Sequence, residues 1–347
     1  MSEKIKKSGF SGDYLLEVRG LKKYFDITAG FRFGKTNRRY LRAVDNVSFA
    51  LRPGETLGLV GESGCGKSTT GNCIIRLLDP TEGEILFEGI DVAKVPERRL
   101  QLVRKEIQMI FQDPYSSLNP RLRVKDLIAE PFWSDKSMSS AQREKEIYRL
   151  LEIVGLPRDY AGRFPHEFSG GQRQRIGIAR ALARKPKLII CDEPISALDV
   201  SIQAQILNLL AALQKEFALT YIFISHALAS IRYVSTQVAV MYLGRIVEFA
   251  DTETLFREPS HPYTEGLMAA VPVSDPALRE NKKRIILEGD IPSPAAPPSG
   301  CHFHPRCRYA DAVCGEVSPS FMEIKPGHCV ACHHPLKPGD AISAIGS

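Results

Sequence analysis

The sequence predicts an α/β protein in which apolar strands alternate with amphipathic helices. Short apolar runs bounded by turn residues, such as Thr56–Val60 and Leu188–Cys191, indicate buried strands. A longer amphipathic segment, Ser201–Phe217, indicates a helix. A glycine-rich segment joins the strand at Thr56–Val60 to a helix predicted over Thr69–Leu78. This order is typical of a sheet with helices on its faces.

The remaining elements alternate in the same way. The first two strands are predicted at Leu15–Leu21 and Ala43–Leu51, before a turn at 52–55. The stretch Gln112–Pro186 is mostly helical, and we expect it to be an insertion into the sheet. The other predicted elements are strands Ile85–Phe87, Ile107–Phe111 and Thr220–Ser225, helices Ala141–Val154 and Gln172–Ala183, and a hairpin of Val238–Leu243 with Arg245–Phe249 about Gly244.

The length and composition exclude several classes of protein. The chain has 347 residues, of which 44% are hydrophobic and 25% charged, so it is neither wholly disordered nor collagen-like. It contains no run of about 18–20 apolar residues, and no apolar segment follows the start MSEKIKK. We therefore expect no secretory signal, and any membrane association to be peripheral.

The positive charge is concentrated near the N-terminus. Residues 1–42 hold eleven Lys or Arg against four Asp or Glu, whereas the whole chain has a net charge of +6. A nucleic-acid-binding protein more often spreads basic residues along one face, so we expect no nucleic-acid partner. A solvated basic loop around Arg32–Arg39 is the simplest interpretation, and contact with anionic lipid is the alternative.

A phosphate-binding loop follows the strand Thr56–Val60. Its sequence fits G-x-x-x-x-G-K-[ST] and consists of Gly61, Glu62, Ser63, Gly64, Cys65, Gly66, Lys67 and Ser68, with Thr69 opening the helix. The glycines let successive N–H groups face phosphate oxygens. Lys67 is expected to contact the β- and γ-phosphates of ATP, and Ser68 to offer its hydroxyl to Mg²⁺.

Two carboxylates end the strand Leu188–Cys191. Asp192 is expected to hold Mg²⁺, directly or through water, and Glu193 to act as general base toward the attacking water. An apolar run followed by two acids is by itself more often a strand that ends in solvent. The preceding phosphate-binding loop favours the functional interpretation.

The segment Phe168–Arg175 resembles the signature of ATP-binding cassette (ABC) ATPases. It contains Ser169, Gly170, Gly171 and Gln172, and a Ser-Gly-Gly helix start offers a second set of N–H groups to phosphate. In this family two domains pair head to tail and bury two ATP molecules. The resemblance implies an ABC-type P-loop NTPase fold, with a RecA-like core, an antiparallel β subdomain and a helical subdomain.

Three further residues match the family's motifs in order. Gln112, in Phe111–Pro114, resembles the Q-loop residue that senses Mg²⁺ and the attacking water. Asp199, in Ser196–Asp199, resembles the D-loop residue that crosses the dimer interface. His226 resembles the switch histidine that contacts the γ-phosphate. The family usually has aspartate after this histidine, whereas this chain has Ala227.

One aromatic side chain is expected to stack on adenine. Phe25, or its neighbour Tyr24, occupies the position of the family's A-loop aromatic. An aromatic residue of the hydrophobic core is the competing interpretation for either residue.

The resemblance extends to oligopeptide/dipeptide importer ATPases. Three segments show this resemblance, namely Gln112–Arg121, Val240–Glu248 and Pro259–Thr264. Together with the basic loop after Phe25, they favour the F-type subunit (OppF/DppF-like). This implies a D-type ATPase partner, two membrane permease subunits, an extracytoplasmic solute-binding protein and a peripheral place on the cytoplasmic face of the membrane. Nickel, opines or glutathione are alternative cargoes, and a soluble non-transport ABC ATPase is an alternative function.

The domain boundaries follow from the resemblance and from composition. We expect an ABC ATPase domain at 1–258 with its helical subdomain at about 113–186, and an importer-type extension at 259–300. The extension contains the proline-rich arm Ile291–Ser299. A small Cys/His-rich tail domain is expected at 301–347.

The tail is expected to bind a metal. Five of eight cysteines fall between 301 and 332, and in a chain without an export signal such a cluster favours metal over disulfides. In this importer family four tail cysteines are reported to hold a four-iron four-sulfur cluster. By motif position these are Cys301, Cys307, Cys314 and Cys332, with Cys329 as an extra thiol. Zinc and the absence of any metal remain alternatives.

Overall fold

The computed structural model describes residues 13–28, 38–133, 138–270, 287 and 289–337. The chain divides into two compact units. The loop unit comprises Met1–Leu51, Thr56–Ala93 and Ser225–Ser347, and the helical unit comprises Arg52–Glu55 and Lys94–Ile224. The basic loop predicted at Arg32–Arg39 lies mostly outside the described residues.

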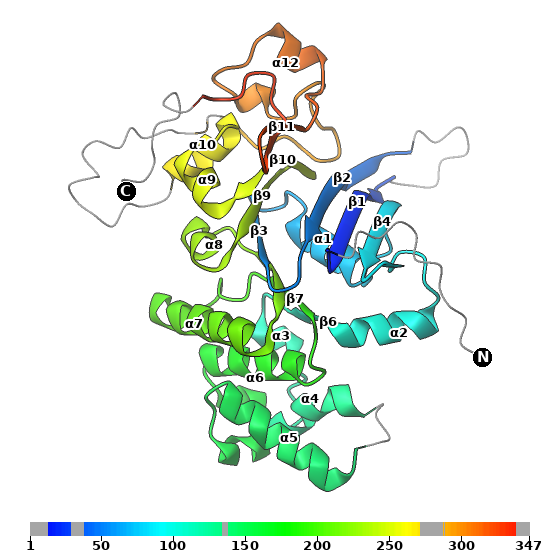
Figure 1. The fold of residues 1–347 in the computed structure, drawn as a ribbon, viewed down its shortest axis with the longest axis vertical. Helices are drawn as coiled ribbons and strands as arrows, with labels where there is room; N and C mark the ends of the chain where they lie inside the picture. Colours follow the sequence, from blue (N-terminus) through cyan, green and yellow to red (C-terminus); the bar gives the residue numbers. More distant parts are fainter. Residues whose placement is uncertain (1–12, 29–37, 134–137, 271–286, 288, 338–347) are drawn as a thin grey trace, which may run out of the picture. The chain divides into compact units, whose positions relative to one another are not determined.

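A small antiparallel sheet forms the N-terminal part of the loop unit (Figure 1). Its strand order is β2-β1-β4-β5, with β1 at Leu16–Asp26, β2 at Tyr40–Leu51, β4 at Glu82–Phe87 and β5 at Ile90–Asp91. Leu16 pairs with Leu51 on one side and Phe87 on the other, and all three are buried. The first strand predicted from the sequence is confirmed, and it continues five residues further.

The second sheet of the loop unit leads to the phosphate-binding loop. Its strand order is β11-β12-β10-β9-β3, with β3 parallel to β9 and the other pairs antiparallel. The predicted hairpin is confirmed as β9 and β10. Two tail strands extend this sheet. The strands of this sheet are β3 Thr56–Val60, β9 Gln237–Tyr242, β10 Arg245–Asp251, β11 Met322–Lys325 and β12 His328–Val330.

Short helices accompany this second sheet. The helix α1, Lys67–Ile74, begins at the end of the phosphate-binding loop and ends four residues earlier than predicted. The others are α8 Leu228–Val234, α9 Thr252–Arg257, α10 Pro262–Ala269, the 3₁₀ turn His304–Arg306 and α12 Ala312–Glu316. These five helical segments were not predicted from the sequence.

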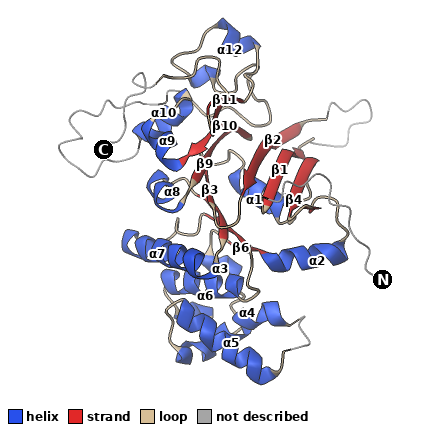
Figure 2. Ribbon diagram, in the orientation of Figure 1, coloured by secondary structure: helices blue, strands red, loops and turns tan. Residues whose placement is uncertain are grey.

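The helical unit combines three parallel strands with helices (Figure 2). Strand β7, Leu188–Asp192, lies between β6, Ile107–Ile110, and β8, Thr220–Ile224. All five residues of β7 and of β8 are buried, as their apolar runs predict. The helices are α2 Glu97–Glu106, α3 Pro114–Ser117, α4 Val124–Ala129, α5 Ser140–Ile153, α6 Gly170–Leu182 and α7 Val200–Phe217, with 3₁₀ turns at Glu130–Phe132, Arg158–Gly162 and Pro165–Glu167.

Local sequence signals explain the long helices of this unit. Ser139 and Gln142 form a capping box that starts α5, and Ile147, Leu150 and Leu151 give this helix its buried face. Ala218, in the left-handed conformation, ends α7. Within the described part of the chain, no helix is both long and apolar enough to cross a membrane.

Candidate active site

The phosphate-binding loop connects the buried strand β3 to α1 in the loop unit. Gly66 has a φ of 106°, and a Cβ at this position would lie 2.0 Å from the carbonyl oxygen of Ala43. Only glycine fits here, because the conformation is left-handed and the neighbouring backbone is too close. Ser63 and Gly64 are exposed at the tip of the loop, whereas Gly66 and Lys67 are buried.

The ammonium of Lys67 points back into the loop. Its Nζ donates to the carbonyl oxygens of Gly61, at 2.8 Å, and Glu62, at 3.0 Å, and the side chain is only 4% exposed. The thiol of Cys65 is buried beside it, and this burial raises the pKa of the thiol. The loop thus holds a cation on its own carbonyl oxygens, and a positive charge in this loop is suited to an anionic ligand.

The acidic pair lies at the end of β7 in the helical unit. Asp192 is buried, and the Glu193 carboxylate accepts a hydrogen bond from Gln112 Nε2 at 3.0 Å. The parallel pairing of β6 with β7 explains this contact, because the two strands end side by side. Glu193 follows β7 directly, and Gln112 lies two residues past the end of β6. The structure therefore brings together two predicted site residues that are 81 positions apart.

The backbone of Glu193 is strained. Its φ of 45° lies in the left-handed region, which costs a non-glycine residue about 1–3 kcal/mol. Two backbone hydrogen bonds stabilise it, one from Glu193 N to Ile224 O at 2.9 Å and one from Ser196 N to Glu193 O at 3.2 Å. Such strain is typical of functional sites.

The signature segment starts helix α6. Ser169 and Gln172 form a capping box, in which each side chain accepts a hydrogen bond from the other's backbone N–H. Ser169 and Gly170 are exposed, whereas Gly171 is buried. A Cβ on Gly171 would lie 2.5 Å from Cγ2 of Ile202, so this glycine lets α6 pack closely on α7.

The other predicted residues lie at helix starts or in the first strand. Asp199 is the exposed N-cap position of α7, and the exposed His226 precedes Ala227, the N-cap position of α8. Ala227 offers no capping side chain, and its N–H donates to Ser225 Oγ instead. Tyr24 donates its hydroxyl to Asp45, at 2.5 Å, whereas the ring of Phe25 lies 5.0 Å from Lys23 Nζ.

Two family models match the chain. The ABC transporter model covers residues 44–196, and the model of the oligopeptide/dipeptide transporter C-terminal region covers 247–314. The oligopeptide transport ATP-binding protein AppF of Bacillus subtilis is 53% identical over 320 residues, which are 92% of this chain and 97% of AppF. The chain belongs to the ABC transporter ATP-binding proteins of the oligopeptide/dipeptide family. The predicted F-type family is confirmed.

Other relatives agree with this family and with its fold. The "Probable peptide ABC transporter ATP-binding protein y4tS" of Sinorhizobium fredii is 53% identical, over 92% of this chain and 90% of its own. The ATP-binding cassette MJ0796, solved as a dimer bound to ADP and Pi, superposes with a TM-score of 0.59 at 28% identity, over 68% of this chain and 98% of its own. The structure of cbiO1 from Clostridium perfringens superposes with a TM-score of 0.60 at 25% identity, over 70% of this chain and 91% of its own. The predicted ABC ATPase fold and ATP-hydrolysing activity are confirmed.

The four cysteines named for the tail of this ABC ATPase influence one another electrostatically. The pKa of Cys332 is raised to about 12, mainly by burial and further by the nearby thiols of Cys301, Cys307 and Cys314. The pKa of Cys329 is raised by burial and by Glu323 instead. Electrostatic interactions thus link the four thiols with one another, and Cys329 is not among the groups that shift the pKa of Cys332.

A mixed set of donors also occurs in the tail. The donor atoms of Asp311, Cys314 and His334 lie within 4.8 Å of one another, and His334 Nε2 is 2.9 Å from the Asp311 carboxylate. Three thiols do not approach this closely in the described residues. A mononuclear tetrahedral zinc site would need sulfur atoms about 3.8 Å apart, given a Zn–S distance of about 2.3 Å.

A buried carboxylate joins the importer-type extension to the tail, and the sequence analysis missed this role. Glu248 is fully buried and accepts hydrogen bonds from the N–H groups of Ser260, at 2.6 Å, and His261, at 2.9 Å. Its Oε1 also lies 2.7 Å from Nε2 of the buried His328. This carboxylate therefore connects two segments that the sequence analysis identified only by family resemblance, Val240–Glu248 and Pro259–Thr264.

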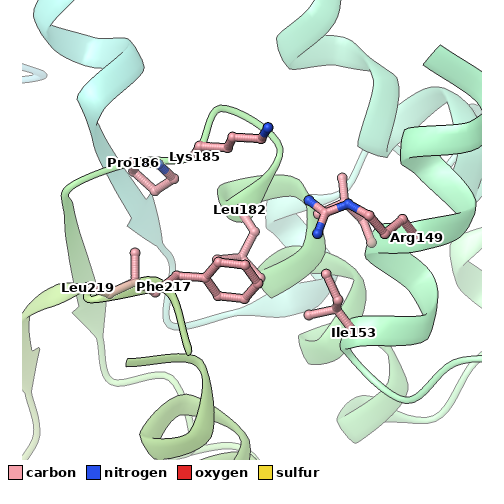
Figure 3. Close-up of a pocket in the computed structure, with 8 residues that line it drawn as sticks. Arg149, Ile153, Leu182, Lys185, Pro186, Phe217 and Leu219 are labelled. Carbon is pink, nitrogen blue, oxygen red and sulfur yellow. The ribbon is translucent and has the colours of Figure 1, made fainter. Parts of the chain in front are cut away.

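A separate cavity of about 270 Å³ lies within the helical unit (Figure 3). Phe217, Leu182 and Ile153 form its apolar lining, and Arg149 and Lys185 place charges beside it. None of the residues that line it belongs to the predicted ATP motifs.

Proposed function

We propose that ATP binds with its β- and γ-phosphates on loop 61–68. Lys67 is held by two carbonyl oxygens, and the anionic oxygens of ATP are stronger acceptors for its ammonium. Ser68, Gln112 and Asp192 supply the oxygen donors that Mg²⁺ prefers. When bound, Mg²⁺ neutralises charge that develops on the phosphate oxygens. Phe25, with a half-buried ring, is the candidate for stacking on adenine.

Glu193 is proposed as the general base for hydrolysis. It accepts a proton from the attacking water while the γ-phosphoryl group passes to that water and ADP leaves. The observation that carries this assignment is the 3.0 Å hydrogen bond from Gln112 to Glu193, because it orients the carboxylate. His226 contacts the γ-phosphate in this scheme.

A head-to-tail dimer completes each ATP site in this proposal. Ser169 and Gly170 are exposed at the start of α6, where unpaired N–H groups favour an anion. Asp199, which the family resemblance places at the dimer interface, is exposed too. A D-type ATPase is the proposed partner. We also propose that the ATPase domain spans 1–258, with its helical subdomain at about 113–186.

The proposed cargo is a di- or oligopeptide. The names of the relatives and of the C-terminal family model support this cargo. ATP-driven closure of the dimer would reorient two permease subunits, and hydrolysis would reset them. The chain would then act at the cytoplasmic face of the membrane, with an extracytoplasmic protein delivering the solute.

Uptake of a labelled dipeptide and tripeptide by the host tests the cargo. We expect Glu193→Gln to abolish uptake and the wild-type chain to restore it. Unchanged uptake in a host without a second peptide importer would contradict peptide import, and nickel, opine and glutathione uptake would then be measured. If the chain co-purifies with no membrane protein, the soluble non-transport alternative gains support instead.

We further propose that Cys301, Cys307, Cys314 and Cys332 bind one metal centre in the tail, a small domain at 301–347. Their mutual effect on pKa supports this set, and four thiolates suit a four-iron four-sulfur cluster. Zinc is the alternative, and it requires the thiols to move closer together. The centre would crosslink a tail that has few buried residues of its own.

Anaerobic purification tests the metal centre. We expect iron and a broad visible absorption band in the wild type, and loss of both in Cys307→Ser. Cys329→Ser is the matched control and should keep both, because Cys329 lies outside the group. Zinc without iron would support the alternative, and neither metal would contradict the proposal.

A further inference from the structure

The phosphate-binding loop contains a carboxylate whose partner comes from the tail. Glu62 is the second residue of the loop, and its carboxylate accepts two hydrogen bonds from Arg306, at 2.8 and 3.1 Å. The two residues are 244 positions apart and belong to the same unit. The Glu62 N–H donates to the hydroxyl of Tyr263 at 2.8 Å. With Lys67 on its carbonyl oxygen, Glu62 is therefore held at three points.

Both distant partners are fixed by packing. The side chain of Arg306 is 5% exposed, whereas that of Glu62 is 23% exposed. Tyr263 is fully buried, and its ring lies 4.7 Å from Tyr242 and 5.4 Å from Phe303, measured between centroids. Phe303 precedes Arg306 by one 3₁₀ turn, so this aromatic cluster anchors the segment that carries the guanidinium.

The charge of Glu62 matters because the loop must accept a polyphosphate. An unpaired carboxylate in this loop would repel ATP, and partial burial would weaken the screening of that repulsion by water. The planar guanidinium of Arg306 neutralises the carboxylate through both oxygens. The hydrogen bond raises the pKa of Arg306 well above its usual range, so the cation persists at any physiological pH.

We propose that Arg306 is a positioning residue for ATP: it neutralises Glu62 and, together with Tyr263, sets the conformation of the phosphate-binding loop. The inference rests on the proposed role of residues 61–68 and is independent of the transported solute. It gives the C-terminal tail a direct part in nucleotide affinity.

A double-mutant cycle on the full chain tests this inference. Affinity for MgATP is measured by titration for the wild type, Arg306→Gln, Glu62→Gln and the double variant. We expect Arg306→Gln to raise Kd on the order of tenfold or more, because it leaves the carboxylate unpaired. The double variant should bind at least several-fold more tightly than Arg306→Gln, because the charge that needs Arg306 is gone. Arg306→Lys should fall between the wild type and Arg306→Gln.

Two controls separate the possible outcomes. Arg308→Gln removes another tail arginine, one that pairs with Glu265 and not with the loop, and should change Kd less than twofold. Lys67→Ala should abolish MgATP binding; if it does not, the proposed role of the loop fails. If Lys67→Ala fails to bind while Arg306→Gln binds like the wild type, this inference alone is wrong. A double variant as weak as Arg306→Gln would overturn the electrostatic argument.

Discussion

The two units hold their functional residues by different kinds of contact. In the helical unit, Ser169 is fixed by Gln172, three residues away, and Glu193 by residues at the ends of neighbouring strands. In the loop unit, Glu62 depends on Tyr263 and Arg306, more than 200 positions away. A capping pair three residues apart leaves a motif in the sequence, whereas side-chain partners more than 200 positions away leave none.

The largest expected effect concerns the helical unit. Glu193→Gln should lower ATP turnover by about 10²–10⁴-fold and keep ATP binding, because only the proton acceptor is lost. Gln112→Ala should cause a smaller loss, since it removes the group that orients Glu193. Steady-state phosphate release and equilibrium ATP binding by the assembled complex check both. Similar turnover in Glu193→Gln and the wild type would refute the assignment.

The second prediction concerns the distant contacts of the loop unit. Glu248→Ala should lower the free energy of unfolding by about 3–5 kcal/mol, because it leaves buried donors from Ser260, His261 and His328 unsatisfied. Urea unfolding measures this loss. Glu258→Ala is the control and should lower the free energy of unfolding far less, since its ion pair with Lys325 is at the surface. Equal losses of unfolding free energy in Glu248→Ala and Glu258→Ala would contradict the larger role given to the buried contacts.

The third prediction is a dependence of stability on pH. Burial lowers the pKa of His261 to about 4, against about 6.5 when unfolded. The unfolded chain therefore binds a proton on His261 more readily than the folded chain does. The contribution of neutral His261 to the free energy of unfolding is complete above pH 6.5 and is lost as the pH falls toward 4. The loss reaches about 3 kcal/mol.

His261→Asn should flatten this dependence. Asparagine can still cap α10, where His261 Nδ1 now accepts the N–H of Tyr263. The difference in unfolding free energy between the wild type and His261→Asn, followed from pH 7 to pH 4, is the measurement. A difference that does not change with pH would exclude His261 as the source.

The smallest expected effect tests the local contacts. Ser169→Ala should lower the free energy of unfolding by about 1 kcal/mol through loss of the N-cap of α6. Ser169→Asp keeps a capping oxygen and should recover most of this stability. If Ser169→Ala costs as much as Glu248→Ala, the contacts of the helical unit are not as local as the hydrogen bonds indicate.

The same difference explains what the sequence could predict. The strand Thr56–Val60 and the helix Ser201–Phe217 were predicted to within one residue, because burial and periodicity are local signals. The short helices α8 and α9 were missed, since each has only three buried residues and gives little periodicity. Helix α10 was missed because six of its eight residues are buried, which leaves no one-sided apolar pattern. Gln112 and Glu193 were each expected at the attacking water, Gln112 by the family resemblance, but their direct hydrogen bond was not predicted. The contact of Glu62 with Arg306 could not be predicted, because no local pattern links two side chains that are 244 positions apart.

The contact between Glu62 and Arg306 has a consequence for the tail itself. If the tail strengthens ATP binding, thermodynamic reciprocity requires ATP to strengthen the attachment of the tail by the same factor. ATP then acts as a stabilising ligand for the segment Cys301–Cys307, whose amide hydrogens should exchange more slowly when the loop is filled. Each cycle of hydrolysis would loosen and tighten a segment that lies 244 positions along the chain from the loop.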